Sequence, residues 1–239
     1  MALAAAALAA AGSQAMGIPI APAAVGLAFC GTLVVYNVDR LRDYDRDRET
    51  TPARSDFVAR HGAGLSLLTV AAGVSSVYFA VAAGATAVLV LAPILGLGLL
   101  HRRIKHLTFA KSAYITAAWV GVVVGVPAAI DPRATHVAWT GGIFALAIFA
   151  NAMASNIRDR EVAAARFGTA AVLGVARGLA AAGIAAGCLA PGAARALVAV
   201  PIATFLVLLP FRQEERYGLY AVDGALVVGA LGSIAALRL

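Results

Sequence analysis

Acidic residues recur at four-residue intervals where the first long apolar run of the chain finishes. Asp39 ends an apolar run over residues 19–39, and Asp43 and Asp47 follow at this spacing. If a helix continues past the apolar run, the three carboxylates lie on one helical face and repel one another. Bound cations relieve such repulsion, and carboxylate oxygens are ligands that Mg²⁺ prefers. The spacing therefore indicates a magnesium site that could hold a polyanion such as a diphosphate.

A second polar cluster follows another apolar run, over residues 135–157. It contains Asn156, Asp159 and Glu161. If both clusters lie on one side of a helix bundle, together they could hold one diphosphate through metal ions. The alternative is a solvated surface, because the six acids and six arginines of residues 39–60 could neutralise one another.

The elements that must position these clusters are membrane-spanning helices. The chain of 239 residues is 62% hydrophobic and only 13% charged, which leaves too little polar material to cover a water-soluble domain. Its mean hydropathy is +0.87. Apolar runs alternate with short charged or Gly/Pro-marked breaks, at about 2–15, 19–39, 61–81, 84–101, 110–129, 135–157, 168–188, 192–210 and 217–237. We therefore predict an all-α polytopic membrane protein in which residues 1–239 form a single domain with about nine transmembrane helices.

Charge is distributed unequally between the two membrane faces that these runs imply. If the runs alternate in direction, fifteen of the nineteen Lys and Arg residues share one face, which the positive-inside rule makes cytoplasmic. The net charge of +7 thus reflects insertion into the membrane, and we expect no nucleic-acid partner. Ten of the twelve acids share that face, although insertion does not require it. The acidic clusters are therefore where chemistry is expected.

Three smaller features complete the expected organisation. Residues 1–11 lack a basic segment, which favours a short first span over a cleaved signal peptide. Cys30 and Cys188 lie far apart in apolar runs and are expected to be buried thiols. Arg177 and Asp223 fall within apolar runs, where charge is costly, so they are either functional residues or a structural ion pair.

The two clusters also indicate an internal duplication. Tyr36-Asn37-Val38-Asp39-Arg40 closes the second run, and Ser155-Asn156-Ile157-Arg158-Asp159-Arg160 closes the sixth. Both the fourth and the eighth run end in basic segments as well. The pattern favours two pseudo-repeated four-helix halves, an arrangement in which binding sites often form between the halves.

Asp39-Arg40-Leu41-Arg42-Asp43 and Asn156-Ile157-Arg158-Asp159-Arg160-Glu161 resemble the two aspartate-rich motifs of UbiA-type intramembrane prenyltransferases. The stretch His101-Arg102-Arg103-Ile104-Lys105 is similar to the lysine-bearing segment that follows the fourth helix in that family. The three segments occur in the family's order, after the second, fourth and sixth runs. The resemblance covers nearly the whole chain and implies a UbiA-like bundle of nine helices.

The chain departs from the family pattern at several positions. Val35 stands where the first motif usually begins with Asn, although Asn37 is nearby, and a second register would instead make Asp43 and Asp47 the aspartate pair. In the second motif, Asn156 replaces the first acid and Ala163 the last. His101 replaces a common Tyr of the basic segment.

The resemblance implies a Mg²⁺-dependent enzyme that ionises an isoprenoid diphosphate and transfers the prenyl group to an aromatic or lipid acceptor within the membrane. The implied metal ligands are Asp39, Asp43, Asp47, Asp159 and Glu161. The implied catalytic residues are Asp39, Asp43, Asp159 and Lys105. The implied diphosphate-binding residues are Asn37, Arg40, Arg102, Lys105, Asn156 and Arg158.

Three other functions fit the same sequence features. A UbiA-type terpene cyclase would let the allylic cation react with its own chain and would need no acceptor. A membrane transporter could also contain duplicated halves and intramembrane charges, although here the charges gather at one face. A catalytically inactive scaffold would account for the missing acid at Ala163.

Overall fold

The computed structural model describes the chain except for residues 46–47, 49–50, 105–107, 159–161 and 239. For residues 97–104, 158 and 162 it describes the backbone alone. The described residues form helices and no strand, as the composition predicts. The helical segments are α1 (Ala2–Ala15), α2 (Pro22–Arg42), α4 (Pro52–Ala83), α5 (Ala85–Ile104), α6 (Ala110–Val120), η1 (Gly121–Gly125), α7 (Val126–Ile130), α8 (Val137–Arg158), α9 (Val162–Phe167), α10 (Thr169–Leu189), η2 (Gly192–Val198), α11 (Ala199–Leu208), α12 (Glu215–Tyr217), η3 (Gly218–Val222) and α13 (Asp223–Ala236).

Helix boundaries follow local backbone chemistry. Pro22 and Pro52 occupy the start of α2 and α4, where a missing N–H costs nothing. Gly84 separates α4 from α5 with a φ of +90°, and Gly168 precedes α10 with a φ of +81°. Glycine adopts these angles without the steric cost that a Cβ atom imposes. Pro210 follows the last residues of α11, where it cannot continue the helix.

Six of the helical segments in the described part of the chain are long and apolar enough to cross a membrane. They are residues Pro22–Arg42, Pro52–Ala83, Ala110–Ile130, Val137–Ile157, Thr169–Leu189 and Glu215–Ala236. Three further apolar segments are shorter, namely Ala2–Ala15, Ala85–Gly96 and Gly192–Leu208. The nine predicted runs therefore all fall on helices, and six of them reach the length of a span within the fully described part of the chain. The predicted all-helical, membrane-embedded chain is confirmed. The predicted count of about nine transmembrane helices is not confirmed.

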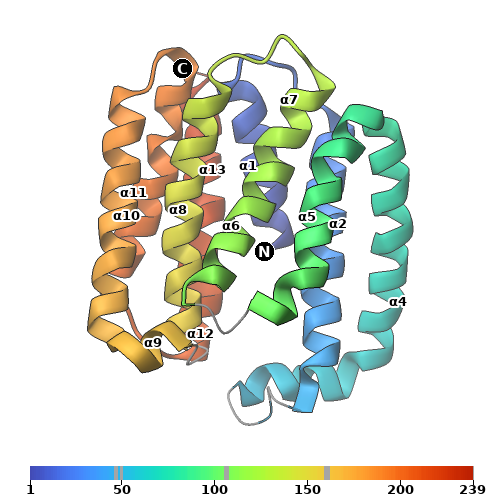
Figure 1. Cartoon of the computed structure of the whole chain (residues 1–239), viewed down its shortest axis with the longest axis vertical. Helices are drawn as coiled ribbons and strands as arrows, with labels where there is room; N and C mark the ends of the chain where they lie inside the picture. Colours follow the sequence, from blue (N-terminus) through green and yellow to red (C-terminus); the bar gives the residue numbers. More distant parts are fainter. Residues whose placement is uncertain (46–47, 49–50, 105–107, 159–161, 239) are drawn as a thin grey trace.

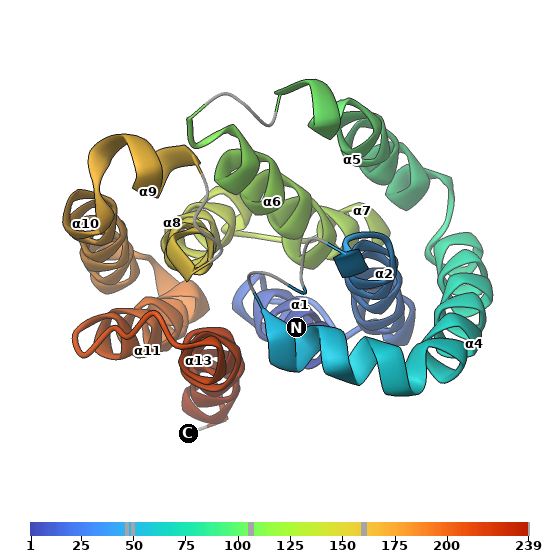
Figure 2. The same ribbon diagram turned by 90° about the horizontal axis from the view of Figure 1, so that it is seen from below.

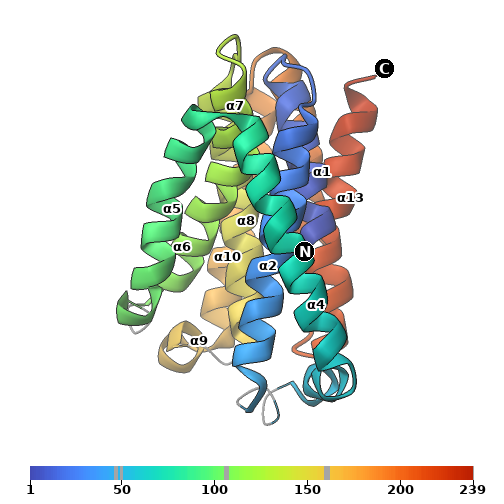
Figure 3. The same ribbon diagram turned by 90° about the vertical axis from the view of Figure 1, so that its right-hand side faces the viewer.

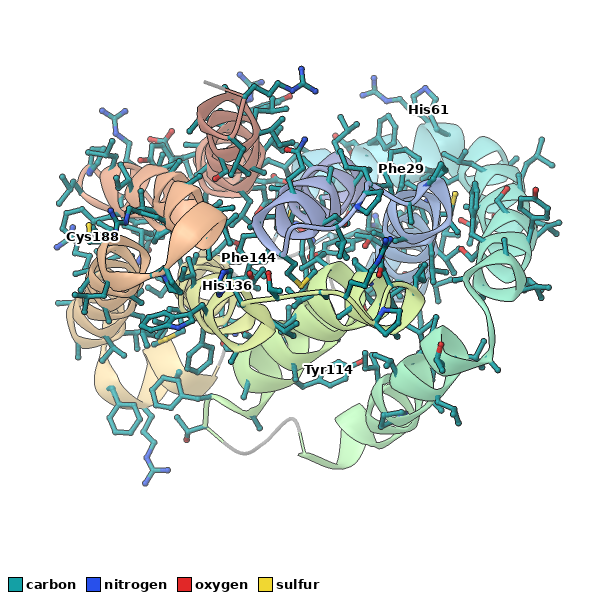
Figure 4. All side chains as sticks on the ribbon, turned by 90° about the horizontal axis from the view of Figure 1, so that it is seen from above. Phe29, His61, Tyr114, His136, Phe144 and Cys188 are labelled. Carbon is teal, nitrogen blue, oxygen red and sulfur yellow. The ribbon has the colours of Figure 1, made fainter. Side chains whose placement is uncertain are left out.

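The short first helix, α1, lies at the centre of the bundle. Its 14 residues span roughly 21 Å at 1.5 Å per residue, less than the hydrocarbon thickness of about 30 Å. Leu8 is fully buried and belongs to a core that includes Phe144 of α8, Leu197 of η2 and Leu226 of α13. Figure 4 shows Phe144 in the interior of the bundle. The many alanines of α1 permit this close approach of several helices, as small residues do in membrane bundles.

The longer helices are arranged in two groups around α1. In Figure 2, α2, α4, α5 and α6 form one arc, and α8, α10, α11 and α13 form the other. Within each arc, helices that follow one another along the chain contact one another. That the chain consists of two pseudo-repeated four-helix halves stays a prediction.

Candidate functional site

One end of the bundle is where α2, α5, α8 and α11 finish and where α4, α6, α9 and α12 begin (Figures 1 and 3). We call it the polar end, because the sequence places its charged segments there. The connections from α1 to α2, from α4 to α5, from α7 to α8 and from α10 to η2 lie at the opposite end. The one-sided gathering of charge is therefore also a feature of the folded chain.

The first acidic motif lies on a helix that continues beyond the apolar run. α2 extends through Arg42, and Asp43 caps it by donating its backbone N–H to the carbonyl oxygen of Asp39 at 2.8 Å. Asp39 is exposed and Asp43 is half-buried. Because these aspartates are four residues apart on α2, their side chains leave the helix on the same side. They are the part of the predicted carboxylate stripe that the structure describes.

Asn37 lies on another side of α2. Positions two apart in a helix differ by about 200° in direction, so Asn37 and Asp39 face nearly opposite ways. Asn37 is only 3% exposed, and among the described residues its Nδ2 atom has no hydrogen-bond partner. A buried amide donor left unsatisfied costs about 1–3 kcal/mol. The Asn37 amide is therefore suited to a polar ligand or a water molecule inside the bundle.

Arg40 shares the Asn37 side of α2 and brings a second candidate residue to the same region. Arg40 and Asp223 of α13 both lie close enough to the Met1 amino group to interact with it electrostatically. Asp223 follows the π-helical turn η3, whose Val222 carbonyl oxygen accepts a hydrogen bond of 2.7 Å from Asn151 Nδ2 of α8. Turns of this kind often occur at functional sites. α2, α8 and α13 thus place polar groups around the start of α1.

The second motif is described only in part. Asn156 is 9% exposed, and its Nδ2 atom donates a hydrogen bond of 2.7 Å to Ser112 Oγ of α6. The backbone of Arg158 ends α8, and that of Arg102 lies in the last turn of α5. The predicted residues Asp47, Lys105, Asp159 and Glu161 lie outside the described residues.

The described carboxylates supply some of the ligands of a magnesium site but not a full set. No group of three His, Cys, Asp or Glu residues gathers within the part of the chain that the structure describes. Asp39 and Asp43, one turn apart at an accessible helix end, provide two hard oxygen donors. Proteins usually hold Mg²⁺ through one or two carboxylates together with substrate phosphates and water. These two residues fit that donor set.

Arg177 has a structural role that the sequence did not reveal. Its Nε and Nη2 atoms donate hydrogen bonds to the carbonyl oxygens of Leu208 and Leu209, at 3.0 and 2.9 Å. Tyr217 Oη donates to the preceding carbonyl, that of Val207, at 2.5 Å. Three consecutive carbonyls at the end of α11 are thereby satisfied by other helices. Arg177 therefore has a structural role at the end of α11.

An apolar groove lies along α6 and α8. It has a volume of about 540 Å³ and is lined by small and apolar side chains that include Ala113, Thr116, Ala117 and Phe149. It begins next to Ser112, which joins α6 to α8 at the polar end. The groove is shallow and open along α6 and α8, and its apolar lining would solvate a hydrocarbon chain well.

Sequence reasoning missed several polar residues of this region. Asn151 and Ser112 carry a signal that could have found them, because uncharged polar residues inside apolar runs tend to bond between helices. Glu215 and Ser55 carry no comparable signal, since both lie in charged segments.

Neither a family model, nor a curated protein, nor a solved structure matches the chain. A functional conclusion therefore rests on the motifs and on their arrangement at the polar end.

Proposed function

We propose that the chain is an intramembrane enzyme that uses Mg²⁺ to ionise an isoprenoid diphosphate and transfers the prenyl group to an aromatic or lipid acceptor. The observation that carries the proposal is that α2 and α8, which bear the two motifs, both finish at the polar end, and that an apolar groove lies along α6 and α8. An amphiphile with an anionic head and a hydrocarbon tail matches both environments. The resemblance of the two motifs to UbiA-type prenyltransferases supports the same substrate class.

The residues have distinct tasks in this proposal. Asp39 and Asp43 would hold the metal together with Asp47, Asp159 and Glu161. Bound Mg²⁺ would stabilise the negative charge that develops on the departing diphosphate. Arg40, Arg102, Lys105 and Arg158 would bind diphosphate oxygens as cations, while Asn37 and Asn156 would contribute amide groups.

The chemistry requires a dry site. Cleavage of the allylic C–O bond leaves the electron pair on the diphosphate and a cation on the prenyl carbon. Water would quench this cation, whereas small apolar residues along α6 and α8 exclude water. The acceptor nucleophile then forms the new bond to the prenyl carbon and loses a proton.

The test is an assay of diphosphate release by the purified chain in lipid nanodiscs with Mg²⁺. Prenyl diphosphates of several lengths are supplied with and without a membrane lipid extract, and the products are identified. We expect release that depends on the extract and falls at least 100-fold in Asp43→Asn, while Asp131→Asn at the opposite end behaves as wild type. Release without extract and formation of a hydrocarbon would instead identify a terpene cyclase. No release under any condition, with Asp43→Asn indistinguishable from wild type, would refute the enzyme proposal.

We also propose that the polar end faces the cytoplasm, because most Lys and Arg residues flank it. The orientation can be tested with Gln213→Cys at the polar end and Arg133→Cys at the opposite end, both in a background carrying Cys30→Ala and Cys188→Ala. A membrane-impermeant thiol reagent added to intact cells should modify only the Arg133→Cys protein. Modification of only the Gln213→Cys protein would reverse the assigned orientation.

A further inference from the structure

The first part of α4 crosses the polar end before the helix turns along the bundle (Figures 1 and 2). We call residues 52–61 the crossing segment. Gly62 and Gly64 follow it, and an added Cβ atom at either position would meet no neighbour within 4 Å. Closely spaced glycines are a common cause of helix bends, because their backbone is easily deformed. Gly62 and Gly64 are therefore the positions where α4 bends most easily between the crossing segment and the rest of the helix.

A residue from the other end of the chain holds the start of this segment. The backbone N–H of Arg54, in the first turn of α4, donates a hydrogen bond of 3.1 Å to Oε1 of Glu215 in α12. The same N–H lies 3.1 Å from the carbonyl oxygen of Thr51, a shared geometry that is common at helix ends. A carboxylate at a helix N-terminus satisfies a free amide and interacts favourably with the helix dipole. Glu215 thus caps α4 from a different helix.

The rest of the crossing segment has a narrow contact with the bundle. Ser55 and Val58 are 3% and 7% exposed, whereas Phe57 is 47% exposed and Arg60 is on the surface. In Figure 4, His61 projects away from the bundle. Elements with few buried side chains open at low free-energy cost. The Glu215 contact therefore acts together with the buried Ser55 and Val58 side chains to hold this segment in place.

A polar atom lies beneath the segment without a protein partner. Ser55 Oγ is buried, and among the described residues it forms no hydrogen bond. A hydroxyl in this state is destabilising unless water or a ligand reaches it. A polar group that reached Ser55 Oγ would therefore remove this cost.

We propose that Glu215 is a latch that holds the crossing segment closed over the polar end, and that the segment opens by bending at Gly62 and Gly64. Opening exposes Ser55 and admits a polar molecule from the aqueous side. The latch follows from the Arg54–Glu215 contact and the shallow packing of the segment. That the admitted group is the diphosphate head of a prenyl substrate rests on the proposed function.

The latch can be tested by the reactivity of a thiol introduced with Ser55→Cys, in a background carrying Cys30→Ala and Cys188→Ala. A water-soluble maleimide is added to the protein in nanodiscs, and the modification rate is measured. Loss of a hydrogen bond to a charged group, worth about 1.5–3 kcal/mol, corresponds to roughly a tenfold or larger increase in opening. We therefore expect Glu215→Ala to raise the rate at least tenfold. Glu214→Ala, which removes the neighbouring exposed carboxylate, should leave the rate unchanged.

Equal modification rates in the Glu215→Ala and Glu214→Ala proteins would overturn the latch. If Glu215→Ala does not fold, Glu215→Gln decides, because its amide oxygen can still accept a weaker hydrogen bond. It should raise the rate about threefold to tenfold, and an unchanged rate would again overturn the proposal. The modification rate does not depend on catalysis. A failed diphosphate-release assay would therefore count against the proposed function and leave the latch to be judged by its own measurement.

Discussion

Asn156 Nδ2 donates a hydrogen bond of 2.7 Å to Ser112 Oγ and so ties α8 to α6 at the polar end. Both residues are buried, with exposed fractions of 9% and 1%. The Asn156 amide therefore has a structural task between two helices.

Ser112→Ala should destabilise the bundle, because it leaves the buried Asn156 amide without this acceptor. We expect a loss of about 1–3 kcal/mol and a lower unfolding temperature in nanodiscs. Thr116→Val is the control, since the Thr116 hydroxyl bonds only to the Ser112 carbonyl of its own helix. An unfolding temperature for Ser112→Ala at or above that of Thr116→Val would show that the α6–α8 bond adds no stability.

Arg177→Ala should loosen the end of α11, because two carbonyl oxygens lose their guanidinium donors. The expected loss of stability is about 1–3 kcal/mol, measured by thermal unfolding in nanodiscs. Tyr217→Phe removes the third capping bond and should cost about 1 kcal/mol. Arg212→Ala removes an exposed cation nearby and should be neutral. Equal effects of Arg177→Ala and Arg212→Ala would mean that the cap contributes no stability.

Gly229 and Gly224 of α13 are two positions whose substitutions can be compared to test how closely this helix packs against α11. A Cβ atom at Gly229 would lie 2.5 Å from the Cα atom of Val200 in α11, whereas one at Gly224 would meet nothing within 4 Å. Gly229→Ala should therefore cost about 1–3 kcal/mol through overpacking. Gly224→Ala should stabilise the helix by roughly 0.5–1 kcal/mol. Thermal unfolding of the two variants checks the difference, and similar shifts in the two would contradict this close helix contact.

Asp131 and Arg133 form an ion pair at the end opposite the polar end. Arg133 donates hydrogen bonds from Nε to Oδ1 at 2.9 Å and from Nη2 to Oδ2 at 2.7 Å. These bonds lower the pKa of Asp131 from its ordinary value of 3.8 to about 2. Because the pKa is lower in the folded chain, the pair stabilises the fold fully above pH 3.8 and loses this effect as the pH falls through about 2.

An NMR titration of the Asp131 carboxyl group in nanodiscs should show this low pKa. Arg133→Ala should raise the pKa toward 3.8, because it removes the side-chain hydrogen bonds and the charge of Arg133 and keeps only the bond from the backbone N–H. The Arg133 side chain is 79% exposed, so added salt should weaken the pair. A pKa near 3.8 in the wild-type chain would show that the ion pair does not form in solution.

Several features of this protein follow from its sequence alone. Hydrophobic runs determine an all-helical membrane-embedded chain, because apolar side chains avoid water and an isolated backbone in lipid must satisfy its own hydrogen bonds. The spacing of Asp39 and Asp43 determines that they share a helix face. The alternation of the runs places the charged segments at one end, as the structure also does.

Other features depend on tertiary contacts that no local pattern encodes. The central position of α1, the bond from Asn156 to Ser112 and the use of Arg177 as a cap each join residues far apart in the chain. The Glu215 cap joins positions 161 residues apart. Such contacts are decided by how helices pack, since a side chain finds its partner only after separate helices have been brought together. The sequence thus determined which residues could do chemistry, and the tertiary structure decided which of the described ones are already engaged in holding the bundle together.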